Sequence, residues 1–301
     1  MLFIQPIKYY QMIKVGYLLS YDYHMFLTSV KQLYDYVDKI VVGVDQDYKT
    51  WSGNSFEIPN YFFDEVKAFD KRNKIQFYFD TFYIPNLSPM ECETRERNLV
   101  LAKLGRGWKI QLDVDEYIYD FKNVAKYLKN YWYLTLFPKY TPICFNGTLV
   151  TLFRKLPNGY LYINNNESFP FITNQMANVH TRRNDTIRNH LSDIKVIHQS
   201  WARTEEEIQF KINNWGHRDD FNTQEYFEFW KNLNSDNYLE FKNVHPIVPE
   251  VWDKLHFMNC SSIDEFIYNY ASENHQELFF IDKQKMIIAL KNRILKKFLK
   301  C

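Results

Sequence analysis

The alternation of short apolar runs with a helical pattern over the first third of the chain most constrains its fold. The runs at 12–20 (MIKVGYLLS) and 39–45 (KIVVGVD) have the length and composition of buried strands. Between them, residues 23–37 repeat apolar side chains at helical spacing. A strand, a helix and a second strand in this order predict a βαβ unit, whose strands are parallel and joined by a right-handed crossover.

The same alternation continues beyond this unit. Residues 73–79 (NKIQFYF) predict a third strand, 91–105 a helix that ends at a glycine, and 108–114 (WKIQLDV) a fourth strand. We therefore expect an α/β fold with a mixed, mostly parallel sheet flanked by helices.

Three carboxylates follow the fourth strand at Asp113, Asp115 and Glu116. Carboxylates this close repel one another and resist burial, so their grouping indicates a cation or a cationic partner. In open α/β sheets the crevice at the carboxyl ends of the strands is where ligands bind. Taken alone, the cluster is equally compatible with a turn or the N-cap of the next helix, predicted around 117–128.

Other polar residues follow the first two strands. Ser20 and Asp22 come at or just past the end of the first strand, and Asp45 ends the second. Tyr21 lies on the same rim and is able to stack on a planar ring. These residues are candidates for contacts with a ligand.

The second half of the chain has a different pattern. A capping box at Thr204 and Glu207 opens a helix over 205–215, and PNG at 157–159 predicts a hairpin. We expect a core of residues 1–220 and a helical C-terminal extension of residues 221–301 packed on it. Shorter strands are predicted at 131–137 (YWYLTLF), 144–154, 159–164 and 193–199.

Composition limits the classes of partner and the compartment. With 37 Lys and Arg against 36 Asp and Glu, the net charge is +1, so no overall field favours nucleic acid. The four cysteines show neither paired metal-ligand spacing nor a disulfide pattern. The N-terminus lacks the pattern of a signal peptide, and no run is long enough to span a bilayer. We therefore expect a cytoplasmic protein.

Two segments carry a resemblance to a known family. Residues 95–116 (RERNLVLAKLGRGWKIQLDVDE) place Arg97 and Asn98 on a helix that a glycine ends, before a strand that leads to DxD. Residues 196–217 (VIHQSWARTEEEIQFKINNWGH) look like the segment that ends the catalytic core in a bacterial and viral subgroup. Together they resemble family 2 type glycosyltransferases of the GT-A (Rossmann-like) fold.

The resemblance implies roles for the acidic pair. A nucleoside-diphosphate sugar loses a diphosphate, whose charge Mn²⁺ or Mg²⁺ neutralises as a Lewis acid. Asp115 would bind this metal directly, and Asp113 would contact the ribose or bind the metal through water. His198 would be the third metal ligand; the rival interpretation is a buried structural histidine.

The resemblance also implies contacts with the nucleotide. Asp45 would accept hydrogen bonds from the base, and Ser20, Tyr21 and Asp22 would line the same rim. Arg97, with its neighbour Asn98, would contact the base or the ribose. Arg97 is also placed for an ion pair with Glu93, four residues back on the helix.

The general base is the least defined of the predicted groups. The Glu-Asp pair and the QxxRW signature common in the family are both missing from this sequence. Glu167 and Asp185 fall in the part of the chain where a base that takes the acceptor's proton is expected. His217 is a candidate for contact with the diphosphate.

The C-terminal segment predicts an amphipathic helix. Ile287, Leu290, Ile294 and Phe298 form one stripe, with lysine and arginine largely opposite. Such a helix either packs on the core or lies on the anionic inner face of a membrane.

The predicted function is metal-dependent transfer of a sugar from a nucleoside diphosphate to a glycan or lipid-linked glycan acceptor in polysaccharide biosynthesis. The resemblance implies inversion at the sugar. Two alternatives remain: a metal-dependent phosphohydrolase that uses the same carboxylates, and a carbohydrate-binding protein that has lost activity on the same scaffold.

Overall fold

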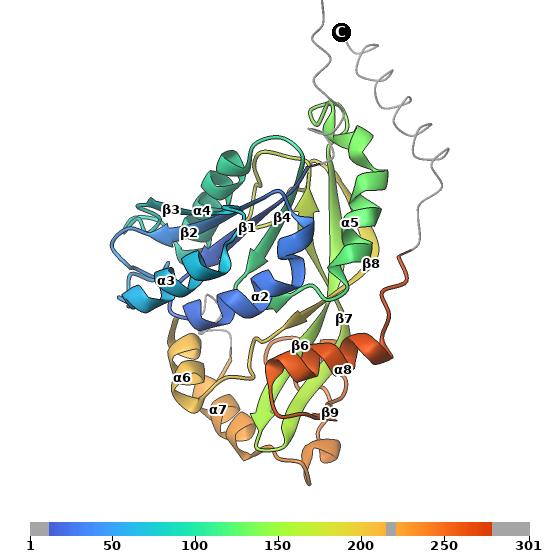
Figure 1. Cartoon of the computed structure of the whole chain (residues 1–301). Helices are drawn as coiled ribbons and strands as arrows, with labels where there is room; N and C mark the ends of the chain where they lie inside the picture. Colours follow the sequence, from blue (N-terminus) through green and yellow to red (C-terminus); the bar gives the residue numbers. More distant parts are fainter. Residues whose placement is uncertain (1–11, 215–220, 279–301) are drawn as a thin grey trace, which may run out of the picture.

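The computed structural model describes residues 12–214 and 221–278, which form one mixed β-sheet with helices on both faces (Figure 1). The strand order is β3-β2-β1-β4-β7-β6-β8-β5, and β9 pairs with β7. This confirms the predicted α/β class. The strands are β1 Ile13–Leu19, β2 Lys39–Asp45, β3 Ile75–Asp80, β4 Trp108–Asp113, β5 Glu116–Tyr117, β6 Ile143–Leu156, β7 Gly159–Thr173, β8 Arg188–His198 and β9 His256–Asn259.

The first four strands form the parallel part of the sheet. β1 lies between β2 and β4, and β3 lies beyond β2, all in parallel register. All seven residues of β1 are buried, as expected for a strand covered on both faces. The predicted βαβ unit is confirmed, with helix α2 (Phe26–Leu33) in the crossover.

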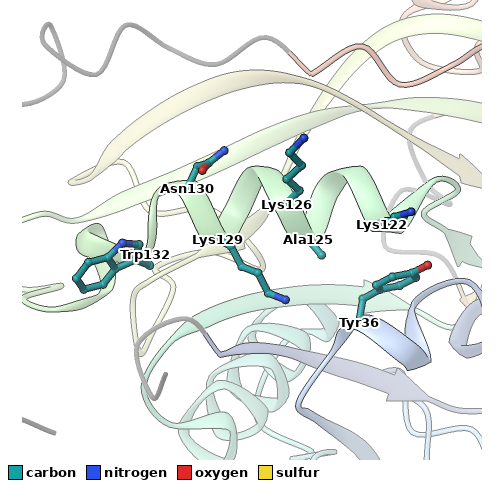
Figure 2. A pocket seen from close by; sticks show the side chains of 7 residues that line it. All are labelled: Tyr36, Lys122, Ala125, Lys126, Lys129, Asn130 and Trp132. Carbon is teal, nitrogen blue, oxygen red and sulfur yellow. The ribbon is translucent and has the colours of Figure 1, made fainter. Parts of the chain in front are cut away.

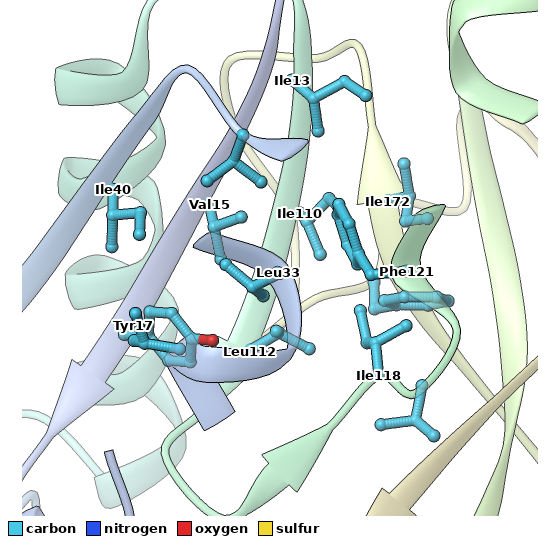
Figure 3. Packing of buried hydrophobic residues seen from close by; sticks show 14 of the residues in the cluster. Ile13, Val15, Tyr17, Leu33, Ile40, Ile110, Leu112, Ile118, Phe121 and Ile172 are labelled. Atoms are coloured by element: carbon cyan, nitrogen blue, oxygen red, sulfur yellow. The ribbon is translucent and has the colours of Figure 1, made fainter. Parts of the chain in front are cut away.

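Helices on opposite faces bury the two sides of these strands. On one face, α2, α3 (Asn60–Phe69) and α5 (Phe121–Asn130) cover the largest apolar cluster, part of which Figure 3 shows. On the other face, α4 (Pro89–Leu104) packs close to the sheet. A Cβ added at Gly16 would lie 2.6 Å from a methyl of Val100 on α4, so only glycine permits this approach. The close packing fixes the position of α4 beside β4.

The second half of the sheet is mixed. β6 pairs antiparallel with β7 and parallel with β8, and β7 joins β4 in antiparallel register. The hairpin predicted at 157–159 is confirmed, because Leu156 and Gly159 pair directly. The capping box is also confirmed: the Glu207 carboxylate accepts from the Thr204 N–H at 2.9 Å, and the Thr204 hydroxyl accepts from the Glu207 N–H at 3.2 Å.

One predicted strand is wrong and one helix was not predicted. Residues 131–137 contain a 3-10 helix, Trp132–Thr135, in place of a strand. Tyr131 and Leu134, three positions apart, both pack into the core, and a short apolar run does not distinguish this spacing from that of a strand. Helix α3, Asn60–Phe69, was missed altogether.

The last part of the described chain packs on the lower end of the sheet (Figure 1). It contains α7 (Thr223–Asn232) and α8 (Ile263–Glu273), which follow α6 (Glu205–Asn214), and it also contributes β9 to the sheet. The predicted amphipathic C-terminal helix and His217 lie outside the described residues. Within residues 12–214 and 221–278, no helix is both long and apolar enough to cross a membrane.

The hairpin between β6 and β7 provides a test of the packing. A Cβ at Gly159 would lie 2.1 Å from the Met258 carbonyl oxygen on β9. A backbone carbonyl in a strand cannot rotate away from this contact as a flexible side chain could. We expect Gly159→Ala to lower the free energy of unfolding by about 2 kcal/mol in urea. Asn158→Ala, in the adjoining exposed turn, serves as the control and should change it by less than about 0.5 kcal/mol. Equal values for the two variants would contradict the described pairing of β7 with β9.

Candidate functional site

The acidic residues lie where β4 ends, at the carboxyl edge of the parallel strands. Asp113 is the last residue of β4 and pairs in register with Leu18, close to the end of β1. Glu116 begins the short strand β5, where it pairs with His198, the last residue of β8. This pairing places His198 beside the acidic cluster although the two are far apart in the sequence.

Asp113 is held by two arginines. Its carboxylate accepts from Arg97 on α4 at 2.8 Å and from Arg182 at 2.6 Å. Burial favours the neutral acid, but the guanidinium groups of Arg182 and Arg97 outweigh it and lower the pKa of Asp113. Arg97 also donates to Glu93 at 2.8 Å, so the predicted ion pair on α4 is present as well.

Asp115 belongs to a second, deeper cluster. Its carboxylate accepts from Arg203 at 2.5 Å and lies 3.4 Å from the Nε2 atom of His198. The same amino group of Arg203 donates to Asp22 at 3.1 Å. Burial opposes the charge on Asp115, but His198 and Arg203 more than offset it and hold its pKa well below the usual value. Burial raises the pKa of Asp22, which Arg203 only partly offsets.

Arg203 retains one unsatisfied donor. Its Nη1 atom is buried and has no hydrogen-bond partner among residues 12–214 and 221–278, while Nη2 bridges the two aspartates. A buried charged donor without a partner is costly, and such a group in a native structure calls for an explanation. An anionic ligand at this end of the sheet would satisfy it.

Glu116 belongs to the Asp113 cluster, and its backbone pairs with that of His198 in the second cluster. One carboxylate oxygen accepts from Arg182 at 3.0 Å, and the other accepts from the backbone N–H of Asp113 at 3.0 Å. Burial raises its pKa, with Arg182 acting in the opposite direction. Glu116 thus fixes the backbone of Asp113 and the side chain of Arg182.

The segment that carries Arg182 is anchored on α4. Asn98 donates to the carbonyl of Asn178 at 3.1 Å and accepts from its N–H at 2.7 Å. Thr94, one turn earlier, accepts from the N–H of Thr181 at 2.7 Å. Asn98, which the sequence placed at the nucleotide, therefore positions the segment that brings Arg182 to Asp113.

A cleft of about 210 Å³ opens beside Asp113. Acidic and basic side chains line it together with Leu149, Phe169 and Pro170, and the Arg182 guanidinium lies 5.4 Å from the centre of the Phe169 ring. The charged lining residues are Glu93, Arg97, Asp113, Glu116, Arg182 and Arg183. A space with charged and apolar walls of this kind suits a sugar or a phosphorylated sugar.

The residues predicted at the end of β1 are close to the deeper cluster. The Ser20 hydroxyl donates to Asp22 at 3.3 Å. The ring of Tyr21 packs edge-on against Phe210 of α6, and the Arg203 guanidinium lies 6.0 Å from its centre. Ser20, Tyr21 and Asp22 therefore share one rim with Arg203.

Asp45 has a different environment from the one its predicted role needs. Its Oδ1 atom accepts from the N–H groups of Asp47 and Lys49, and Oδ2 from those of Phe82 and Tyr83. A carboxylate has about four acceptor positions, and backbone donors occupy them all. In this conformation Asp45 organises two loops, with no acceptor position left for a base.

The two predicted base candidates lie outside these clusters. Glu167, on β7, accepts from the indole N–H of Trp252 at 3.4 Å, and Asp185 lies exposed in the segment after Arg182. Neither lines the cleft, although each is within three residues of one that does.

Sequence reasoning missed two arginines and a lysine. Arg182 lies in TRRN, a segment with no catalytic pattern of its own, and Arg203 lies in SWART, inside the segment 196–217 in which only His198 and His217 were considered as site residues. Lys211 on α6 donates to the carbonyl and hydroxyl of Ser200, each at 2.8 Å, and burial lowers its pKa to about 8. The only sequence signal was indirect, since buried carboxylates demand cationic partners.

The predicted metal-ligand set is only partly assembled. Among residues 12–214 and 221–278, no group of three or more His, Cys, Asp or Glu side chains could hold a metal ion. Asp113 is held by Arg97 and Arg182 and Asp115 by Arg203, while Asp115 also lies beside His198. Mg²⁺ commonly uses one or two carboxylates together with substrate phosphates, so this pair fits an ion that binds with a diphosphate.

Comparisons with known proteins were made by family, by sequence and by structure. No family model matches the chain, and no curated protein matches it. Among solved structures, residues 1–349 of TarS from S. aureus match at 14% identity and a TM-score of 0.29, over 48% of this chain and 38% of that one. Mannose-6-phosphate isomerase from Helicobacter pylori matches at 17% identity and a TM-score of 0.31, over 55% of this chain and 61% of that one. At these TM-scores neither similarity supports a function.

The buried ion pairs can be tested by a double-mutant cycle. Arg203→Met leaves Asp22 and Asp115 without their shared cation, and we expect it to lower the free energy of unfolding by about 3–5 kcal/mol. Adding Asp115→Asn should restore part of this loss, because one of the uncompensated charges is removed. The exposed pair between Arg72 and Asp35 is the matched control, since Arg72→Met should cost at most about 1 kcal/mol. Additive effects of the two site substitutions would contradict the described contact.

The pH dependence of stability tests the pair of His198 and Asp115. Burial lowers the pKa of His198, but Asp115 outweighs it and raises that pKa above the ordinary value. The stabilisation from this pair is fully present below about pH 6.5, the pKa of histidine in the unfolded chain. It is lost as the pH rises through the higher pKa of His198 in the folded chain. The free energy of unfolding, measured in urea with EDTA present, should therefore decline less steeply above about pH 6.5 in His198→Gln than in the wild type. The exposed His275 provides the control, because His275→Gln should leave the wild-type profile unchanged.

Proposed function

We propose that the protein is a glycosyltransferase that moves a sugar from a nucleoside-diphosphate donor to a glycan or glycolipid acceptor. The observation that carries this proposal is the buried, unsatisfied guanidinium donor of Arg203 beside the aspartate cluster at the end of β4. A diphosphate leaving group supplies the anionic oxygens that this donor lacks.

The cationic side chains of the site suit a departing diphosphate. Preorganised positive charge stabilises negative charge that develops as a bond breaks, and arginine binds phosphate oxygens with two donors at once. Arg203 would donate to the phosphates through its Nη1 atom. Lys211, packed behind it on α6, adds positive charge to the same region.

The donor's nucleotide is proposed to lie along the end of β1. Tyr21 would contact the base with its ring, and Ser20 and Asp22 would accept or donate hydrogen bonds at the ribose or base. Asp45 would shape this site through the loops that it holds. Asp113, fixed by Arg97 and Arg182, would contact the ribose with its remaining exposed edge.

Asp115 and His198 are proposed to hold Mn²⁺ or Mg²⁺ together with the donor phosphates. Such an ion supplies Lewis-acid neutralisation of the diphosphate. The protein's part is to keep the Asp115 carboxylate ionised, which the neighbouring cations do by lowering its pKa.

The sugar and acceptor are proposed to occupy the cleft beside Asp113. Its apolar lining, which includes Leu149 and Pro170, suits the face of a sugar ring, and its charged lining suits hydroxyl groups. Glu167 and Asp185 stay proposed as alternative general bases. Inversion at the sugar stays part of the proposal.

Donor turnover tests this function. The full chain with Mn²⁺ and a panel of nucleotide sugars should release nucleoside diphosphate from one donor, and the release should require an acceptor for full rate. Asp115→Asn should lower this rate by about 100-fold or more, because it removes a preorganised charge at the leaving group. Asp236→Asn, at an exposed loop position, is the control and should retain the wild-type rate.

Other products would identify the alternatives. Release of inorganic phosphate from simple phosphate esters, lost in Asp115→Asn, would favour the phosphohydrolase. Calorimetric binding of a saccharide without turnover of any donor would favour the carbohydrate-binding protein. Either result would overturn the proposed transfer reaction.

A further inference from the structure

Helix α5 presents a row of lysines away from the core. Lys122, Lys126 and Lys129 follow one another at intervals of four and three residues, which places them on one side of the helix (Figure 2). The row extends about 10 Å along the helix axis. The apolar residues of α5, among them Val124 and Leu128, are buried on the opposite side.

These lysines line a surface cavity of about 500 Å³, whose remaining walls include Tyr36, Trp132 and Asn130 (Figure 2). None of the residues that line it also lines the cleft beside Asp113. The cavity is therefore a separate site, formed by α5, the 3-10 helix that follows it, and Tyr36 of the 3-10 helix Tyr34–Tyr36.

The positive charge of the cavity is not neutralised within the described part of the chain. None of the three lysines has an ion pair there, and no Asp or Glu lines the cavity. The two nearby acids have other partners, since Asp120 accepts from Asn123 at 2.7 Å and Asp35 pairs with Arg72 at 3.1 Å. Three cations with no acid between them favour an anionic ligand.

Aromatic side chains line the cavity at Tyr36 and Trp132, and further exposed rings follow Trp132 in the chain. Tyr36 is 39% exposed, and in the turn after the 3-10 helix Trp132–Thr135, Phe137 is 65% and Tyr140 40% exposed. Exposed rings beside a row of lysines are typical of surfaces that contact a bilayer, where rings sit at the level of the headgroups.

We propose that this face, defined by Lys122, Lys126, Lys129, Trp132 and Phe137, binds the surface of a membrane that contains anionic phospholipids. The lysines bind headgroup phosphates, and the rings of Trp132 and Phe137 insert among the headgroups. This inference goes beyond the proposed function and does not depend on it.

Vesicle flotation of the full chain tests the lysines. We expect the protein to bind vesicles of phosphatidylcholine with about 30% phosphatidylglycerol, and to bind phosphatidylcholine alone weakly. The triple variant Lys122→Gln, Lys126→Gln, Lys129→Gln should lower the partition coefficient about 100-fold, because each surface lysine contributes about fivefold. A control variant replaces the exposed Lys31, Lys67 and Lys71 with glutamine and should retain most of the binding. Equal loss in both variants, or no loss in the first, would overturn the proposal.

A second arm distinguishes a bilayer from a soluble phosphate compound. Phe137→Ser should weaken vesicle binding several-fold while thermal unfolding stays unchanged, because this side chain is mostly exposed. Inositol hexakisphosphate at the same phosphate concentration should compete poorly with the vesicles. Strong competition together with no effect of Phe137→Ser would assign the cavity to a soluble phosphate ligand and overturn the membrane contact.

Discussion

The structure depends on how it balances charge where its parallel strands end. Asp22, Asp113, Asp115 and Glu116 converge at one edge of the sheet, and the burial of so many carboxylates is unfavourable unless cations accompany them. The compensation comes from Arg97, from Arg182, and from His198 with Arg203, which lie in three different parts of the chain. The charges therefore constrain the path of the backbone as firmly as the apolar core does.

The two aspartates of the DxD sequence are not equivalent in this arrangement. Asp113 faces a partly open cleft and is held by two arginines, whereas Asp115 lies deeper, between Arg203 and His198. Glu116 accepts from the backbone of Asp113 and the side chain of Arg182 in the first environment, and its own backbone pairs with that of His198 in the second. The short turn at residues 113–116 thus contributes carboxylates to two different chemical environments.

Much of the fold follows from the pattern of the sequence, and less of the site does. The βαβ unit, the capping box at Thr204 and the hairpin before Gly159 depend on local periodicity and local hydrogen bonds, which a sequence displays directly. The strand predicted at 131–137 is wrong because a continuous apolar run does not reveal that two of its buried residues have helical spacing. Asp113 and Asp115 were recognisable because they follow a strand. Arg182 and Arg203 were not, because only the assembled sheet brings them to the acids.

The pairing of Glu116 with His198 has a consequence for how the chain acquires its site. β5 has no partner until β8 is in place. Of the strands β1 to β8, β8 is the last to be synthesised, directly before α6. A nascent chain that ends before β8 would carry the aspartates without His198 or Arg203. Contacts between such distant segments form late and slowly. The chain would therefore be able to bind a ligand at this site only once these contacts complete the fold.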